Sequence, residues 1–383
     1  MLRTLNNVPR MVYGFGAIGE AGAEMKRLGC ARVFVVTDPG LVELKLHEPL
    51  LASLKAADLA CELFSQAELE PSPPSVHLCA EAARAFGADG FIGLGGGSAL
   101  DTAKAALLLL TNEGEIERYF GVNQVPNPCL PMMLIPTAAG TGSEATSISV
   151  VSNLKTGHKQ GVVSDYLYAK VVLLDPDLTL SMPPHITAMT GMDALVHAME
   201  SYVGLAATPF TDALNLQAIR LVAGNLRKAY AQGSNREARA GMLYAATLAG
   251  MGFSQTQNGI IHAMGMALPL ACKIPHGLAM ASLAPIGMGF NCIAAPEKYA
   301  AIAEILLGEP SGMTALETAR SSVDLVRELL EDLNIAEGLE AHGVSRESLP
   351  EVAAKAAASK RLMDNNPRQA TAKQIQELLE AYY

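Results

Sequence analysis

The sequence has few charged residues and no surplus of positive charge. Charged residues occupy only 17% of the 383 positions, and the formal net charge is −10. An acidic chain repels nucleic acid and anionic lipid, so neither is expected as a partner. Half of the residues are hydrophobic, which is enough to fill a large core, and a chain of this length favours two domains over one.

Closely spaced cysteines and long apolar runs are also missing. No two of the six cysteines form a C-x-x-C pair, so a reducing cytoplasm is the expected compartment. The N-terminus holds no apolar run suited to a signal peptide. The longest stretch without a charged or strongly polar side chain, residues 277–290, is too short to span a bilayer. The sequence therefore predicts a cytoplasmic protein that neither crosses nor binds a membrane.

The first half of the chain alternates apolar, β-branched runs with helical segments. Runs that are apolar throughout and separated by helices are typical of a parallel sheet covered on both faces. The fold class predicted for this half is a doubly wound α/β domain. The predicted strands are residues 31–38, 91–98, 129–137 and 170–176, and residues 101–110 are predicted to form the helix after the second strand.

After Pro183-Pro184 the β-type runs stop, and the rest of the chain is predicted to be an all-helical domain. The predicted helices are residues 186–205, 209–230, 235–252, 296–307, 314–333 and 346–360. We place the domain boundary at residue 185. Residues 1–185 would then form a dinucleotide-binding domain, and residues 186–383 would form a domain that binds metal and substrate.

Two pairs of residues in the second half could hold a metal ion. Asp193 and His197 are four residues apart on a predicted helix, so they share one face. Alone, such a pair is as well explained by an ordinary surface contact. His262 and His276, however, lie in a long apolar segment, where an unpaired imidazole would be costly to bury.

His262 and His276 would be roughly 21 Å apart on one straight helix, too far to share an ion. Prolines at 269 and 275 would break that helix, so the chain can reverse and present His276 at the start of the next one. One carboxylate and three imidazoles suit Fe²⁺ or Zn²⁺ better than Mg²⁺ or Ca²⁺. The five remaining histidines are interpreted as ordinary surface or core residues: His47, His77, His158, His185 and His342.

Two glycine-rich turns in the first half suggest a dinucleotide site. GGGSALDTAK (95–104) and PTAAGTGSE (136–144) each follow a predicted strand. Glycines there let backbone N–H groups approach a pyrophosphate, and two such turns on one sheet suit a dinucleotide at its carboxyl edge. The first turn lacks the Gly-Lys-Ser/Thr of a nucleoside-triphosphate loop, so ATP hydrolysis is not expected.

A formal G-x-G-x-x-G at Gly14, Gly16 and Gly19 is interpreted as a structural loop, because the strand before it would be very short. Asp38 stands at the end of a predicted strand. An acidic side chain there can bind the ribose hydroxyls and would repel a 2′-phosphate, which favours NAD over NADP.

Beyond these single motifs, the chain resembles the iron-containing (group III) alcohol dehydrogenases, and in particular their lactaldehyde reductase and 1,3-propanediol dehydrogenase group. The resemblance is carried by GGGSALDTAK, PTAAGTGSEAT, the run from Asp175 to Tyr202, His262 through Gly277, and NNPR (365–368). It extends over nearly the whole chain.

The resemblance implies the fold also found in dehydroquinate synthase, with an α/β N-terminal and an all-α C-terminal domain. It implies an NAD-dependent dehydrogenase that transfers a hydride between NAD(H) and a small alcohol or aldehyde, with the metal as a Lewis acid on the substrate oxygen. A homodimer or larger homo-oligomer is usual in the family. The implied metal ligands are Asp193, His197, His262 and His276. The implied cofactor-binding residues are Asp38, Gly95, Gly96, Gly97, Ser98, Asp101, Thr137, Thr141, Ser143 and Lys159.

One position departs from the family pattern. Many members carry a second histidine four residues after the third ligand, associated with proton relay, where this chain has Met266. A thioether cannot carry a proton. Either Met266 is a wall of the substrate pocket, which is the interpretation we favour, or the relay is missing and the enzyme is impaired. Three alternatives remain at this point: a lyase of the dehydroquinate synthase kind that uses NAD internally, a glycerol dehydrogenase, and a non-enzymatic scaffold.

Overall fold

The structure is a computed structural model that describes residues 5–6, 9–153, 155–268 and 272–383. The chain divides into two compact units, Met1–Ser181 and Met182–Tyr383. The first unit combines strands with helices. The second unit is helical, and no strand occurs among its described residues.

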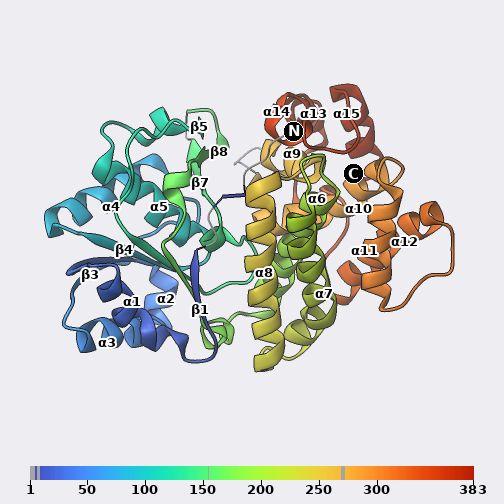
Figure 1. Cartoon of the computed structure of the whole chain (residues 1–383). Coiled ribbons are helices and arrows are strands. Elements are labelled where there is room, and N and C mark those ends of the chain that lie inside the picture. Colours follow the sequence, from blue (N-terminus) through green and yellow to red (C-terminus); the bar gives the residue numbers. More distant parts are fainter. Residues whose placement is uncertain (1–4, 7–8, 154, 269–271) are drawn as a thin grey trace. The chain divides into compact units, whose positions relative to one another are not determined.

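A six-stranded sheet forms the centre of the first unit (Figure 1). All of its neighbouring strands pair in parallel, which confirms the predicted parallel sheet. Three of its strands are buried along their whole length, as their apolar sequences require: β4 (Gly90–Gly95), β6 (Met132–Pro136) and β9 (Val171–Leu174). In spatial order the strands are β1 (Arg10–Tyr13), β9 (Val171–Leu174), β6 (Met132–Pro136), β4 (Gly90–Gly95), β2 (Arg32–Val36) and β3 (Ala60–Phe64).

Helices cover both faces of this sheet (Figure 1). They are α1 (Ala21–Arg27), α2 (Pro39–Glu43), α3 (Glu48–Ala56), α4 (Pro73–Phe86) and α5 (Gly97–Thr111). Side chains alternate along β2: Val33 and Val35 belong to a core cluster with Met25 of α1 and Leu50 of α3. On the opposite face, the ring of Phe34 lies 6.4 Å from that of Phe86 in α4. The first unit is therefore doubly wound, as predicted.

A second, three-stranded sheet was not predicted. It consists of β5 (Gly121–Val122), β8 (His158–Val163) and β7 (Ile148–Asn153), and β7 and β8 form an antiparallel pair. All residues of β8 except Val162 are only half-buried. Such a strand lacks the apolar run that marked the strands of the main sheet, and the exposed edge strand β3 was missed for the same reason.

Several predicted boundaries were wrong. The predicted strand 91–98 ends at Gly95. Strand β2 ends at Val36, and Asp38 instead caps the next helix, α2, by accepting a hydrogen bond from the backbone of Leu41. The predicted strand 129–137 begins only at Met132. The helix predicted from residue 101 begins at Gly97, so part of the glycine turn forms its first helical turn.

The second unit consists of ten α-helices within the described residues. They are α6 (Pro184–Val203), α7 (Pro209–Ala231), α8 (Arg236–Thr256), α9 (Ile260–Ala267), α10 (His276–Asn291), α11 (Pro296–Leu307), α12 (Ala315–Asp332), α13 (Leu349–Ala358), α14 (Lys360–Met363) and α15 (Ala372–Ala381). The predicted helix 296–307 agrees with α11, whereas the predicted 346–360 is longer than α13. None of these helices combines the length and apolar character needed to cross a bilayer.

Close packing around α6 prepares the candidate metal centre. Helix α6 packs against α7, α8 and α10 (Figure 1). A Cβ atom on Gly277, in the first turn of α10, would lie 2.4 Å from the backbone oxygen of Met189 in α6. Only glycine therefore permits this approach of α10 to α6. Pro275 precedes α10 and His276 is its first residue, as predicted, while Pro269 lies outside the described residues.

Candidate functional site

Four side chains from three helices of the second unit converge on one point. Asp193 and His197 come from α6, His262 from α9 and His276 from α10, and one potential ligand atom of each lies within 4.8 Å of the other three. The side chains of Asp193, His197 and His262 are at most 5% exposed, whereas His276 is 27% exposed. The structure thus brings together the four residues predicted to hold a metal. The site is more accessible at His276 than at the other three side chains.

The spacing of these atoms suits coordination rather than hydrogen bonding. Oδ1 of Asp193 lies 3.7 Å from Nδ1 of His197 and 3.7 Å from Nε2 of His276. Two ligands that each lie about 2.1 Å from one ion in tetrahedral geometry are about 3.4 Å apart. The rings of His197 and His262 have centroids 4.5 Å apart, and Phe253 of α8 stacks on His197 at 4.3 Å. An ion of the size of Fe²⁺ or Zn²⁺ fits this set.

Glu200 is a member of this site that the sequence analysis missed. Its Oε2 atom lies 2.6 Å from Nδ1 of His262, and its side chain is 1% exposed. Nε2 of His262 is buried and has no hydrogen-bond partner in the part of the chain that the structure describes. A buried imidazole nitrogen without a partner is costly unless it binds a ligand, so His262 fits a metal. The sequence signal that was missed is the spacing of residues 193, 197 and 200, which places all three on one face of the same helix.

In the first unit, predicted cofactor residues gather at the carboxyl ends of neighbouring strands. Gly95 ends β4, and its carbonyl accepts a hydrogen bond of 3.0 Å from the backbone of Thr137, which follows β6. A Cβ atom on Gly95 would lie 3.4 Å from Oδ2 of Asp38, which follows β2. Asp38, Gly95 and Thr137 are therefore close together at the edge where a doubly wound sheet binds its ligand.

The start of α5 offers an open N-terminus. Gly96 is its N-cap residue, and a Cβ atom there would meet only the Cβ of Ala138, at 3.9 Å. On Gly97 it would instead lie 2.7 Å from Cγ2 of Thr141, so the second glycine turn packs directly on the first. Backbone N–H groups at the start of a fifteen-residue helix favour an anion, and the phosphates of a dinucleotide fit this position.

Other predicted cofactor residues have partners within the protein. Ser98 donates to the backbone oxygen of Leu69 at 2.5 Å, and Lys159 of β8 pairs with Glu70 at 2.7 Å. Ser143 donates to Asp101 at 2.6 Å. The carboxylate of Asp101 also accepts a hydrogen bond of 3.0 Å from the backbone of Val150. The Asp101 and Ser143 pair therefore holds the second glycine turn against α5.

Lys104 strengthens the same contact and was not singled out from the sequence. Its fully buried ammonium donates to the backbone oxygens of Ser143 and Ile148, at 2.5 and 2.8 Å. Burial lowers the pKa of Lys104 to about 8, although the carboxylates of Asp101 and Glu144 oppose that shift. A lysine in the middle of a helix, directly before the apolar run 105–110, could have indicated such a buried role.

The glycines at positions 14, 16 and 19 form a loop whose donors are already used. The backbone N–H groups of Gly16 and Ile18 each donate to the carboxylate of Asp175 at 3.1 Å. The strand before the loop, β1, has four residues. This arrangement agrees with the interpretation of a structural loop.

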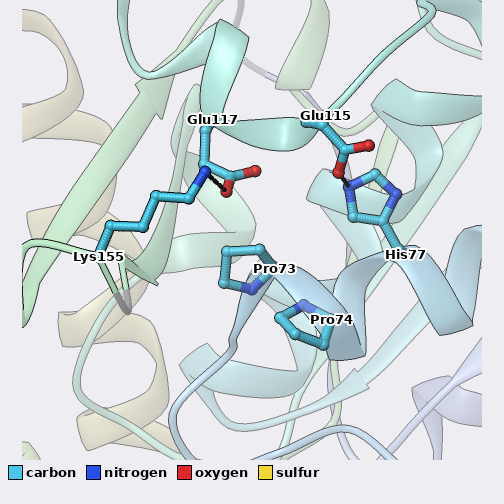
Figure 2. A pocket seen from close by; sticks show the side chains of 6 residues that line it. All are labelled: Pro73, Pro74, His77, Glu115, Glu117 and Lys155. Carbon is cyan, nitrogen blue, oxygen red and sulfur yellow. Dashed lines mark ion pairs between the residues drawn. The ribbon is translucent and has the colours of Figure 1, made fainter.

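A further group of polar residues lies beside α4, around Pro73 and Pro74 (Figure 2). His77 pairs with Glu115 at 2.9 Å, and Lys155 pairs with Glu117 at 3.2 Å. Glu115 is 73% exposed and Lys155 is 80% exposed. Because a lysine already neutralises Glu117, we interpret this group as a surface ion-pair network, which leaves His77 an ordinary surface residue.

Comparison with known proteins places the chain in a family. It matches the description "Iron-containing alcohol dehydrogenase" over residues 9–176 and "Fe-containing alcohol dehydrogenase family, C-terminal" over residues 187–383. The chain is 56% identical to the sulfoacetaldehyde reductase of Bilophila wadsworthia (strain 3_1_6) over 378 residues, 98% of each chain.

Solved structures agree with this match. A crystal structure of 1,3-propanediol oxidoreductase is 35% identical, with a TM-score of 0.95, and the alignment covers 100% of this chain and 99% of that one. The sulfoacetaldehyde reductase of Bifidobacterium kashiwanohense, solved in complex with NAD⁺, is 28% identical with a TM-score of 0.89 and covers 100% and 99%. The chain therefore belongs to the iron-containing alcohol dehydrogenase family and is an NAD-dependent, metal-containing oxidoreductase of small alcohols and aldehydes, neither a lyase nor a scaffold.

Proposed function

We propose that this enzyme reduces sulfoacetaldehyde, a two-carbon aldehyde that carries a sulfonate, with NADH. The observation that carries the proposal is the 56% identity, over 98% of both chains, to a sulfoacetaldehyde reductase. The reaction consumes one aldehyde, one NADH and one proton, and yields the 2-hydroxy sulfonate and NAD⁺. NADH supplies the hydride.

We propose Asp193, His197, His262 and His276 as the ligands of the catalytic metal. Their convergence and the unpartnered Nε2 of His262 support this assignment. A metal ion bound there supplies a Lewis acid that polarises the carbonyl group. The four side chains would fix the position of the metal ion. The three most buried of them would exclude water from one side of the ion. His276, the most exposed of the four, marks the side from which substrate enters.

Within the first unit, the glycines at 95–97 would hold the pyrophosphate of the cofactor, and Asp38 would bind the adenosine ribose. The open position at Gly96 and the closeness of Asp38 to Gly95 support these roles. Ser98 would belong to the pyrophosphate site, and Thr137, Thr141 and Lys159 would lie along the cofactor. Residues 1–185 would thus bind the dinucleotide, while residues 186–383 would bind metal and substrate.

The sulfonate needs a cation near the metal ligands, and two basic residues are candidates. Arg361 lies on α14, which packs against α9, the helix that carries His262. Asn366, five residues further on, accepts a hydrogen bond from the backbone of Ile260, two residues before His262. Arg361 is exposed and has no hydrogen-bond or ion-pair partner among the described residues.

The second candidate cation is Lys273, three residues before His276. It is exposed and likewise has no partner within the described ranges. Of the two, Arg361 is the stronger candidate, because a guanidinium presents paired donors that match two oxygens of an oxyanion. Met266, on α9 and half-buried, would form an apolar wall of the same pocket.

We further propose a cytoplasmic enzyme that works as a homodimer or larger homo-oligomer and has no nucleic-acid or membrane partner. The six cysteines support a reducing compartment, because all of them are free: Cys30, Cys61, Cys79, Cys129, Cys272 and Cys292.

Steady-state kinetics of the iron-loaded enzyme with NADH test the proposed substrate. The panel consists of sulfoacetaldehyde, propanal and 3-hydroxypropanal. The proposal predicts the highest kcat/KM for sulfoacetaldehyde. A higher value for 3-hydroxypropanal would instead support the second candidate, a 1,3-propanediol dehydrogenase, which the similarity to the 1,3-propanediol oxidoreductase structure favours.

A further inference from the structure

Glu200 contacts both the side chain and the backbone around His262. Its Oε2 atom lies 2.6 Å from Nδ1 of His262 and also accepts a hydrogen bond of 3.3 Å from the backbone N–H of the same residue. Its Oε1 atom accepts a hydrogen bond of 2.6 Å from the backbone N–H of Ile261. The carboxylate therefore has three donors around it, all of them from the first turn of α9.

The same turn is held from a second side. Oδ1 of Asn366 accepts a hydrogen bond of 3.1 Å from the backbone of Ile260. Gly259 makes room for both acceptors, because a Cβ atom there would lie 2.7 Å from Oδ1 of Asn366 and 3.1 Å from Oε1 of Glu200. Glu200 and Asn366 thus satisfy the free backbone donors at the start of α9, but only Glu200 contacts the imidazole.

We propose that Glu200 is a positioning residue, which fixes the ring orientation and the tautomer of His262 so that Nε2 presents a lone pair to the metal. An ionised carboxylate only accepts hydrogen bonds, so Nδ1 of His262 must carry the proton. Nε2 is then the unprotonated nitrogen of the neutral ring and is free to coordinate. The inference rests on the proposed metal site and does not depend on which aldehyde is reduced.

Glutamine at position 200 would keep the shape but reverse this preference. Three donors face the carboxylate, and an amide has only one oxygen to offer them. If the amide NH₂ faced Nδ1 of His262, the ring would have to accept there and would carry its proton on Nε2. If the NH₂ faced the backbone of Ile261 instead, two donors would oppose each other in a buried site. Either orientation weakens metal binding at Nε2.

Metal affinity separates this role from a merely structural one. The purified full-length chain is stripped with a chelator and titrated with Co²⁺ in competition with a chromophoric chelator, and the d–d absorption of bound Co²⁺ reports the coordination. We expect Glu200→Gln to bind Co²⁺ about 10- to 100-fold more weakly. Glu200→Asp keeps an acceptor-only side chain and should recover much of the affinity.

Asn366→Ala is the control, because it removes the hydrogen bond to the same turn of α9, together with those to Asn291 and Arg368, but none to His262. It should leave Co²⁺ affinity within about threefold of the natural protein. Unchanged affinity in Glu200→Gln, or an equal loss in Asn366→Ala, would overturn the proposal.

A second measurement reads the tautomer of His262 with Glu200 unchanged, and a variant serves only to assign the signal. Two-bond ¹H–¹⁵N correlation spectra of the metal-free chain, labelled with ¹⁵N-histidine, report the tautomer of each neutral ring; the His262→Gln spectrum identifies the signal of His262. We expect the proton of His262 on Nδ1. A proton on Nε2 would contradict the assigned role of Glu200.

Discussion

Oδ1 of Asp193 lies 3.7 Å from Nε2 of His276, although the two residues come from different helices, α6 and α10. The contact exists because α10 begins directly after Pro275 and because Gly277 lets its first turn reach the backbone of α6. The position of His276 therefore depends on a helix start and a glycine contact rather than on a sequence motif alone. His276, the more exposed of the two, lies at the accessible side of the candidate metal centre.

Replacing His276 by alanine should release the metal. The variant would lose a ligand without a change in the packing of Gly277. Without the metal, the negative charge that develops on the substrate oxygen would lose several kcal/mol of stabilisation. Such a loss corresponds to a decrease in activity of about a thousandfold. Elemental analysis of metal per chain, together with turnover under iron-saturating conditions, measures both effects.

His185→Ala is the control for this experiment, because His185 is exposed and belongs to the first turn of α6, the helix that carries two of the proposed ligands. It should keep full metal occupancy and activity. Full occupancy and normal turnover in His276→Ala would show that the ligand assignment is wrong.

Alanine at position 96 tests the proposed pyrophosphate site. The fold should accept the added methyl group, since its nearest neighbour would be the Cβ of Ala138 at 3.9 Å. The methyl group would, however, occupy the space in which phosphate oxygens approach the backbone at the start of α5. We expect the Kd for NAD⁺, measured by calorimetry, to rise at least about tenfold. A loss of about 1.4 kcal/mol of binding free energy is enough for this change.

The control for the glycine substitution is Gly224→Ala in α7, where no atom lies within 4 Å of the added methyl group. This variant should bind NAD⁺ normally and be slightly more stable, because alanine favours a helix over glycine. If Gly96→Ala bound NAD⁺ as the natural protein does, the cofactor would not contact this turn.

Asparagine at position 38 tests the cofactor preference. Asp38 also caps α2 through Leu41, so a substitution must keep an acceptor there, and the amide oxygen of asparagine does so. The substitution removes only the negative charge that would repel a 2′-phosphate. The ratio of kcat/KM for NADH to that for NADPH should fall roughly tenfold, equivalent to about 1.4 kcal/mol. A natural protein that already prefers NADPH would refute this role.

Methionine at position 361 tests the sulfonate anchor. Without the guanidinium, kcat/KM for sulfoacetaldehyde should fall roughly 10- to 100-fold, since a charged hydrogen bond contributes about 1.5–3 kcal/mol. The value for propanal should stay within about threefold. An equal loss for both aldehydes would argue against an anchor at Arg361.

Lys273→Met tests the second candidate cation by the same comparison of the two aldehydes. Lys228→Met is the control, because Lys228 is exposed and lies on a helix without any proposed ligand.

Much of this architecture could be predicted from the sequence. Fully apolar strands such as 132–136 and 171–174 revealed the parallel sheet, because a strand buried on both faces needs no polar residue. The four metal-ligating candidates could be found because ionisable side chains are conspicuous in apolar helices. Strands β3 and β8 could not be found, since partly exposed strands carry polar side chains and their pairing depends on distant residues.

Supporting residues were harder to recognise than those they support. Glu200 contacts His262 across 62 positions of sequence, and Lys104 binds backbone oxygens about 40 residues away, so neither contact follows from local spacing. Asp38 was expected at the end of a strand, but its side chain favoured the cap of α2 instead, which ended the strand two residues earlier. Long-range contacts of this kind depend on the folded topology.

A competition assay tests the proposed activity most directly. The iron-loaded enzyme is given NADH with equal concentrations of sulfoacetaldehyde and propanal, and the two alcohol products are quantified while little of either aldehyde has been consumed. The product ratio then equals the ratio of the two kcat/KM values. The proposed function predicts at least about a tenfold excess of the hydroxy sulfonate, as expected when one charged contact of about 1.5–3 kcal/mol discriminates between the substrates. Equal amounts of both products, or an excess of propanol, would contradict it.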